Sequence, residues 1–213
     1  MSARIKLLVG LCNPGREYAG TRHNAGAWLV ERIAEGASTR FVREPKFHAY
    51  VARVSAAGGE IRLLLPQTYM NESGLAVRSA ARFFRIASEE IVVAHDELDL
   101  KPGVVKMKRG GGNAGHNGLK DVAEKLGSGD FWRVRIGIGH PRDTVLVGHD
   151  VVDYVLHPPR REEQALIDDA IARAVAAWPY LRDGDAERAM HELHTRAPSP
   201  SSVPVSPAQG SPR

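Results

Sequence analysis

The sequence is poor in cysteine, and this absence limits both its covalent structure and its chemistry. Cys12 is the single cysteine among 213 residues, so the chain cannot form an internal disulfide. A chain without disulfides is typical of a reducing compartment, and we expect a cytoplasmic protein. Cys12 ends an apolar segment, where a small buried hydrophobic side chain is a simpler interpretation than a reactive thiol.

Long hydrophobic runs are also lacking. No apolar run reaches the roughly 20 residues of a membrane-spanning helix, so we expect no membrane partner. The short apolar stretch at the N-terminus runs into Asn13-Pro14-Gly15, a turn sequence, and this favours a first strand over a signal peptide. Hydrophobic residues make up 43% of the chain and charged residues 25%, the composition of a globular domain with its own core.

Several catalytic motifs do not occur. The sequence has no G-x-S-x-G elbow, which argues against a serine-nucleophile hydrolase. It has no H-E-x-x-H zinc motif, because His191 and His194 are three residues apart rather than four, and we interpret them as one polar face of a terminal helix. The G-x-x-x-x-G-K-[ST] phosphate loop is missing too. These absences favour direct attack by a His-activated water on a labile bond such as an ester, without metal or cofactor.

Strand-like and helix-like segments alternate along most of the chain. The expected strands are 4–12, 47–55, 60–66, 90–95, 103–109 and 132–138, and the expected helices are 24–36, 71–86, 118–126, 160–178 and 183–195. This alternation predicts a single-domain α/β/α sandwich around one twisted, mixed and largely parallel sheet. The side chains expected on the inner face of the second helix are Leu75, Ala76, Ser79, Phe83 and Phe84.

The last part of the chain differs in composition. Residues 197–213 are rich in Pro and Ser and have no apolar period, so we expect a disordered tail after a domain that covers residues 1–196.

Basic residues gather near a glycine-rich loop. The chain has a net charge of +4, and the residues on either side of the loop are Lys101, Lys106, Lys108, Arg109, Arg133 and Arg135. They can bind an anionic partner, although ordinary lysines on a solvated edge strand explain them as well. The loop itself has the G-x-G-x-x-G spacing from Gly110 to Gly115. No acidic residue closes a strand about 20 residues later, which disfavours dinucleotide binding.

Polar residues of acid–base and amide types recur where strands end and helices begin. They are Asn13, His23, Asn24, Asn71, His95, Asp96, His116 and Asn117. Sites of open α/β sheets form at the carboxyl ends of strands, so several of these residues can converge. A His can act as general base, an Asp can hold its tautomer, and Asn amides can place a water or stabilise an oxyanion. The structural alternatives remain open: Asn13 as a turn former, Asn24 and Asn71 as helix caps, and Asp96 as a strand end.

Four ordered stretches resemble the bacterial peptidyl-tRNA hydrolase family. They are VGLCNPGREYAGTRHNAGAW (9–28), PQTYMNESG (66–74), VAHDELDLKPGVVKMKRGGGNAGHNGLKD (93–121) and RVRIGIGHP (133–141). The resemblance covers roughly residues 3–195. It implies a monomeric cytoplasmic esterase that cleaves the bond between a peptide and the 3′ ribose of tRNA and so recycles tRNA from aborted translation.

The resemblance also implies roles for individual residues. By match, His23 would be the general base that activates water, and Asp96 would hold its imidazole and stabilise the charged form. Asn13 would contact the peptide near the ester and discriminate blocked from free aminoacyl-tRNA. Asn71 would help to bind the peptide and fix the water or His23.

Further residues would complete the site by the same resemblance. The residues that would line it or support it are Tyr18, Tyr69, Met70, His116 and Asn117. Lys106, Lys108 and Arg135 would clamp phosphates of the tRNA acceptor end, in contacts that weaken with salt. No metal and no cofactor is implied.

The glycine loop departs from the family's usual sequence. Asn113 and Ala114 stand where the family often has a His and a Gly. We expect a slightly stiffer lid that is mobile when empty and ordered over bound substrate. A related hypothesis is a non-catalytic RNA-binding relative of the same fold, and the intact His, Asp and Asn set argues against it.

Overall fold

The structure is a computed structural model that describes residues 4–143 and 150–195. The expected tail 197–213 lies outside the described residues. Within them, none of the helices is long and apolar enough to cross a membrane.

A mixed sheet forms the middle layer of the described residues. Its strands are β1 (Leu7–Gly10), β2 (Val42–Glu44), β3 (Ala49–Ala56), β4 (Gly59–Pro66), β5 (Ile91–Glu97), β6 (Val105–Arg109) and β7 (Trp132–Gly137). They lie in the order β2-β3-β4-β1-β5-β7-β6. Strands β4, β1, β5 and β7 run parallel to one another, and antiparallel pairs complete both ends of the sheet. The expected mixed sheet with a parallel centre is confirmed.

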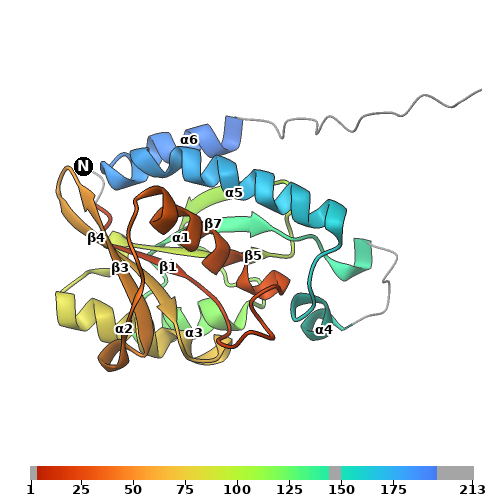
Figure 1. The fold of residues 1–213 in the computed structure, drawn as a ribbon, viewed down its shortest axis with the longest axis horizontal. Helices are drawn as coiled ribbons and strands as arrows, with labels where there is room; N and C mark the ends of the chain where they lie inside the picture. The colour runs from red at the N-terminus through yellow and green to blue at the C-terminus, as the bar shows by residue number, and fades with distance from the viewer. Residues whose placement is uncertain (1–3, 144–149, 196–213) are drawn as a thin grey trace, which may run out of the picture.

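Helices cover both faces of this sheet (Figure 1). They are α1 (Ala25–Gly36), α2 (Ser73–Phe84), α3 (Asn117–Leu126), α4 (Val151–Val155), α5 (Arg161–Arg182) and α6 (Ala186–Thr195). Figure 1 shows α5 and α6 along the top of the sheet and α2 and α3 along the bottom. The α/β/α sandwich is therefore confirmed.

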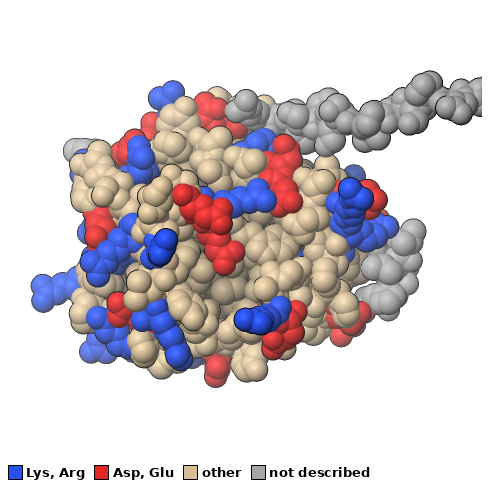
Figure 2. All heavy atoms as spheres, in the orientation of Figure 1, with Lys and Arg blue, Asp and Glu red and all other residues tan. Residues whose placement is uncertain are grey.

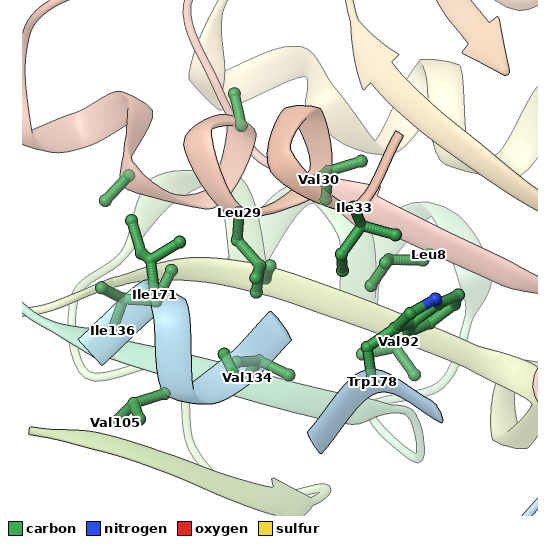
Figure 3. Packing of buried hydrophobic residues seen from close by; sticks show 14 of the residues in the cluster. Leu8, Leu29, Val30, Ile33, Val92, Val105, Val134, Ile136, Ile171 and Trp178 are labelled. Atoms are coloured by element: carbon green, nitrogen blue, oxygen red, sulfur yellow. The ribbon is translucent and has the colours of Figure 1, made fainter. Parts of the chain in front are cut away.

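Alternation along the central strands builds two cores, one on each face. In β1, Leu8 packs with the layer of α1, α5 and α6, while Leu7 and Val9 pack with the layer of α2 and α3. Successive strand residues point to opposite faces, so a continuous apolar run is buried on both sides. Figure 3 shows the first core, to which α1 contributes Leu29, α5 contributes Ile171 and β7 contributes Val134.

The inner face of α2 is the expected one only in part. Ala76 is buried and Phe84 packs against the core as expected, but Leu75 and Phe83 are 39% and 61% exposed, and Val77 and Ala80 are buried in their place. A Cβ on Gly74 would lie 2.3 Å from the backbone oxygen of Asp121 in α3, so the two helices pack closely through small side chains. Leu75 and Phe83 were expected on this face, but the close contact of the two helices leaves no room for large side chains there.

Two short elements did not stand out in the sequence. Strand β2 has three residues and α4 has five, which is too short for a recognisable hydrophobic period. Helix α5 also runs past Pro179 to Arg182, beyond the expected end at 178. Trp178 and Leu181 are buried on the sheet side, so packing outweighs the one backbone donor that Pro179 lacks.

Candidate active site

The site forms where β1 and β5 end side by side. His23 lies in a short 3-10 turn, Arg22–Asn24, that leads directly into α1. A Cβ on Gly26 would lie 2.2 Å from the backbone oxygen of Ala94 in β5, so only glycine lets α1 approach the strand this closely. This contact brings the start of α1, and His23 with it, against the carboxyl end of β5, where Asp96 stands.

A cavity of about 340 Å³ opens at this edge of the sheet. Every residue that the sequence placed at the substrate end lines it: Asn13, Tyr18, His23, Tyr69, Met70, Asn71, Asp96, His116 and Asn117. The four matching stretches are far apart in sequence, and three of them contribute to this wall. The expected convergence at the strand ends is thus present in the structure.

His23 and Asp96 form the centre of the site. Nδ1 of His23 lies 3.0 Å from Oδ1 and 3.1 Å from Oδ2 of Asp96. A carboxylate only accepts, so a neutral His23 carries its proton on Nδ1 and leaves a lone pair on Nε2. His23 is partly exposed and lines the cavity, while Asp96 is buried. The arrangement can take a proton from a water molecule in the cavity.

His116 is a second partner of the same carboxylate. Its Nε2 lies 2.9 Å from Oδ1 of Asp96, and its Nδ1 accepts the backbone N–H of Leu119 at 3.3 Å. His116 is the N-cap of α3, as the second contact shows. Since Nδ1 accepts from the helix, Nε2 must carry the proton that is donated to Asp96. Two imidazoles therefore donate to one buried carboxylate.

These contacts shift the pKa values of the pair in opposite directions. Burial alone would raise the pKa of Asp96, but His23 and His116 hold it well below its usual value. Burial would lower the pKa of His23, but the charge and hydrogen bond of Asp96 raise it above 6.5 overall. Asp96 thus stays ionised and favours the imidazolium form of His23.

Asn13 is held in one orientation by its surroundings. Its Oδ1 accepts the backbone N–H of Met70 at 2.7 Å. The side chain of Asn24 binds the backbone of Asn13 through two hydrogen bonds. The Asn13 N–H donates to Asn24 Oδ1 at 2.9 Å, and Asn24 Nδ2 donates to the Asn13 carbonyl at 3.0 Å. With Oδ1 occupied, Asn13 can offer only its Nδ2 donors to the cavity. Asn24 is the N-cap residue just before α1 but makes no side-chain cap, because its side chain binds Asn13 instead.

The remaining cavity residues are more exposed. Asn71 lies in the 3-10 turn Met70–Glu72 and Asn117 is the first residue of α3, and both side chains are exposed to solvent. Tyr69 is 58% exposed, whereas the neighbouring Met70 is buried. They offer amide and aromatic surfaces around the His–Asp pair.

The basic residues on β6 and β7 separate into different environments. Lys106 is exposed and lies opposite Arg135 in the sheet, and Arg135 Nε donates to Glu97 at 2.8 Å. Arg109 forms a two-bond pair with Asp130, 2.7 Å in each bond. Burial, together with the charges of Arg135 and Arg133, lowers the pKa of Lys108. A phosphate near these strands would relieve that repulsion. On the face of the molecule that Figure 2 shows, acidic and basic side chains of the described residues are mixed and no continuous basic patch is seen.

His95, which the sequence placed among the candidate site residues, is buried away from the cavity, and so is Cys12. His95 does not line it, and its Nδ1 donates to the backbone oxygen of Asp96 at 2.6 Å. Burial, and then the nearby His116, lowers the pKa of His95 to about 3, so it stays neutral. Burial raises the pKa of Cys12 to about 12, and its interpretation as a small buried side chain holds.

Sequence reasoning missed three parts of the site. The short helix α4 contributes Val151, Val152 and Val155 to the cavity wall. Arg22 and Arg133 are buried behind the walls, where each binds backbone carbonyls. The sequence did contain signals for both arginines. Arg22 directly precedes the candidate base His23, and Arg133 alternates with apolar residues in β7.

One cluster could also hold a metal ion. His23, Asp96 and His116 have ligand atoms within 4.8 Å of one another. The two imidazole nitrogens nearest to Asp96 already hold protons that they donate to it, so an ion would have to displace both. We assign no metal role to this trio.

The fold and this site together define a hydrolase whose cavity holds a hydrogen-bonded His–Asp pair at the carboxyl ends of parallel strands. The family model described as peptidyl-tRNA hydrolase matches residues 7–201. The chain belongs to the peptidyl-tRNA hydrolase family. Its activity is the hydrolysis of peptidyl-tRNA, and nothing in the comparisons favours a non-catalytic relative.

Solved structures are similar over nearly their whole length. Peptidyl-tRNA hydrolase from Acinetobacter baumannii is 45% identical, with a TM-score of 0.85 over 92% of this chain and 97% of that one. A point mutant of the Acinetobacter baumannii enzyme is 44% identical, with a TM-score of 0.86 over 93% and 99%. A complex of peptidyl-tRNA hydrolase with N-propanol is 45% identical, with a TM-score of 0.85 over 92% and 97%.

Proposed function

We propose that His23 is the general base of ester hydrolysis and that Asp96 holds and charges it. The observation that carries this proposal is the hydrogen bond from His23 Nδ1 to the buried Asp96 carboxylate, which leaves Nε2 as the proton acceptor. Nε2 takes a proton from water as the water oxygen attacks the ester carbonyl carbon. The bond to the 3′ ribose oxygen then breaks, and the imidazolium returns its proton to that oxygen. No covalent enzyme intermediate forms.

Asn13 would bind the peptide side of the ester. Its Oδ1 is occupied by Met70 N–H, so its Nδ2 donates to a carbonyl oxygen of the substrate near the reacting bond. A carbonyl is present next to the ester in a blocked aminoacyl group, whereas a free α-amine offers charge and donors. Asn13 therefore discriminates blocked from free aminoacyl-tRNA.

The other cavity residues would position the substrate. Asn71 and Asn117 bind the peptide backbone with exposed amides, which can both donate and accept. Tyr18 and Tyr69 line the side that receives the 3′-terminal nucleotide, where aromatic rings can stack on a base. Met70 and His116 support these contacts from below. The recognition depends on backbone and ester, so peptides of different sequence are accepted.

The acceptor end of the tRNA would lie along β6 and β7. Lys106, Lys108 and Arg135 come from these neighbouring strands and would contact its phosphates. Phosphate contacts carry no sequence information, so all tRNAs can be bound alike. We further propose that the protein acts as a monomer in the cytoplasm. The substrate of the protein arises during translation, which supports the cytoplasmic location.

A side-by-side hydrolysis assay tests these roles. Wild-type protein should cleave N-blocked aminoacyl-tRNA and leave the free-amine form intact. His23→Ala should lower kcat by about 10²–10⁴-fold while tRNA binding is kept, because only the proton acceptor is lost. Asn13→Ala should reduce the ratio of the cleavage rates of the N-blocked and the free-amine aminoacyl-tRNA. The matched control is Gln164→Ala, which removes an amide on α5 outside the cavity. Near-normal turnover by His23→Ala would overturn the assignment.

A further inference from the structure

The glycine loop is held by a single side chain from the sheet beneath it. Arg133 comes from β7, and its Nη1 donates to the carbonyl of Gly112 at 2.6 Å. Its Nη2 donates to the carbonyl of Gly111 at 2.8 Å and to Oδ1 of Asn113 at 3.3 Å. The guanidinium therefore contacts three successive loop residues with its two terminal nitrogens.

Arg133 is buried without an acidic partner. Its residue surface is 1% exposed, and among residues 4–143 and 150–195 no carboxylate pairs with it. Its Cζ lies 4.8 Å from the ring centre of Phe131. A buried cation is costly unless it is well hydrogen-bonded, so the loop carbonyls are required to keep this side chain in place. The dependence is mutual, because the loop carbonyls have their donor in Arg133.

The loop leads directly to the catalytic cluster. The backbone N–H of His116 donates to the carbonyl of Asn113 at 2.8 Å. His116 in turn donates to Asp96, which accepts from His23. A continuous set of hydrogen bonds thus runs from Arg133 through Asn113 and His116 to the proposed base.

We propose that Arg133, with Asn113 as its side-chain acceptor, is a positioning residue that fixes the glycine loop and so sets His116 and Asn117 against Asp96 and the cavity. Arg133 does not contact substrate or phosphate in this account, although it lies in the basic cluster. The proposal rests on the roles given above to His116 and Asn117. Asn113, which departs from the usual family sequence, is the residue that gives this loop its side-chain contact.

The loop backbone is suited to being held in this way. Gly110, Gly111 and Gly115 have φ values of +67°, +95° and +78°, and Ala114 has +46°. In this loop conformation the carbonyls of Gly111 and Gly112 accept from the guanidinium. A glycine-rich loop without that donor has many other conformations open to it. Removing the donor should therefore loosen the loop before it unfolds the domain.

The test compares two neighbouring arginines of β7. Arg133→Met should lower kcat for N-blocked aminoacyl-tRNA by about 10- to 100-fold, as expected for misplaced site residues. It should speed hydrogen exchange of amides 110–117 and leave the salt dependence of tRNA binding unchanged. Arg135→Met should instead reduce that salt slope by about 1, because it removes a phosphate contact. Arg82→Met, an exposed arginine on α2, controls for lost charge. Arg133→Lys should restore part of kcat.

Milder variants keep the proposal testable if Arg133→Met does not fold. Asn113→Ala should speed exchange of the loop amides about 3-fold or more, and Asn113→Asp should slow it, because a charged acceptor strengthens the bond to Arg133. The proposal would be overturned if Arg133→Met reduced the salt dependence of tRNA binding as much as Arg135→Met does. It would also be overturned if hydrogen exchange of the loop amides were unchanged in the Asn113 variants. Hydrogen exchange needs no substrate, so this outcome is distinct from a failure of the proposed ester chemistry.

Discussion

Two buried arginines hold different walls of the cavity, and they do so with different chemistry. Arg22, next to His23, donates to the carbonyls of His157 and Pro158 and pairs with the buried Glu163 at 2.7 Å. Arg133 binds the glycine loop through neutral acceptors alone. Both are almost fully buried, and the Nε of each has no partner among the described residues.

This difference makes the wall formed by α4 rigid, whereas the wall formed by the glycine loop can change its position. The charge of Arg22 is neutralised by Glu163, and Tyr154 of α4 lies under its guanidinium at 4.0 Å. This contact fixes α4 and its valines as an apolar wall. Arg133 has no salt-bridge partner within the described part of the chain, so the position of the loop depends on a few carbonyl contacts that can be lost one at a time. Changes at Arg22 and Glu163 should therefore alter mainly the free energy of unfolding. Changes at Arg133 and the glycine loop should alter mainly kcat.

The largest expected effect on stability comes from the Arg22 side. Arg22→Met leaves the buried carboxylate of Glu163 with Arg160 alone and removes the donor of three carbonyls, so we expect a loss of about 3 kcal/mol in the free energy of unfolding. Arg160→Met is the matched control, because the Arg160 side chain is 58% exposed and should contribute less than about 1 kcal/mol. Urea unfolding measures the free energy of unfolding of both variants. Equal losses in Arg22→Met and Arg160→Met would contradict the special contribution of the buried Arg22–Glu163 pair.

A smaller effect should appear in the dependence of stability on pH. Burial would raise the pKa of Glu163, but Arg160 and Arg22 lower it below 4.5 overall. The stability that this carboxylate contributes is present above its unfolded-state pKa and is lost as pH falls through its lower folded-state value. Glu163→Gln should flatten the acid loss of stability, whereas Asn113→Ala should leave its slope unchanged. Unfolding curves at several acidic pH values check this, and equal slopes in wild type and Glu163→Gln would contradict it.

The smallest expected effect lies in the glycine loop. Ala114 has a φ of +46°, a left-handed conformation that costs a residue with a side chain about 1–2 kcal/mol. Ala114→Gly removes this strain but adds freedom to the unfolded chain, so the net gain should be about 0.5 kcal/mol. Thermal unfolding detects it as a small rise in Tm. A fall in Tm would mean that the methyl group of Ala114 makes contacts that outweigh the strain.

The sequence predicted the architecture and most of the candidate site. Periodic segments longer than about five residues were found, and the polar residues Asn13, His23, Asp96 and His116 followed from their positions at element ends. The short helix α4 and the inner face of α2 could not be predicted, since both are set by tertiary packing. Arg133 could be placed in a basic cluster, but its burial depends on the path of a loop that sequence patterns do not define.

The pH dependence of kcat/KM tests the central claim most directly, because it reports the ionisation of the free enzyme. With N-blocked aminoacyl-tRNA, the activity of the wild type should fall as pH decreases through the pKa of His23, which Asp96 raises above 6.5. In Asp96→Asn, activity should be lower throughout, and this acidic limb should move to lower pH because the carboxylate charge is gone. An acidic limb at the same pH in both proteins would contradict the assignment of His23 and Asp96.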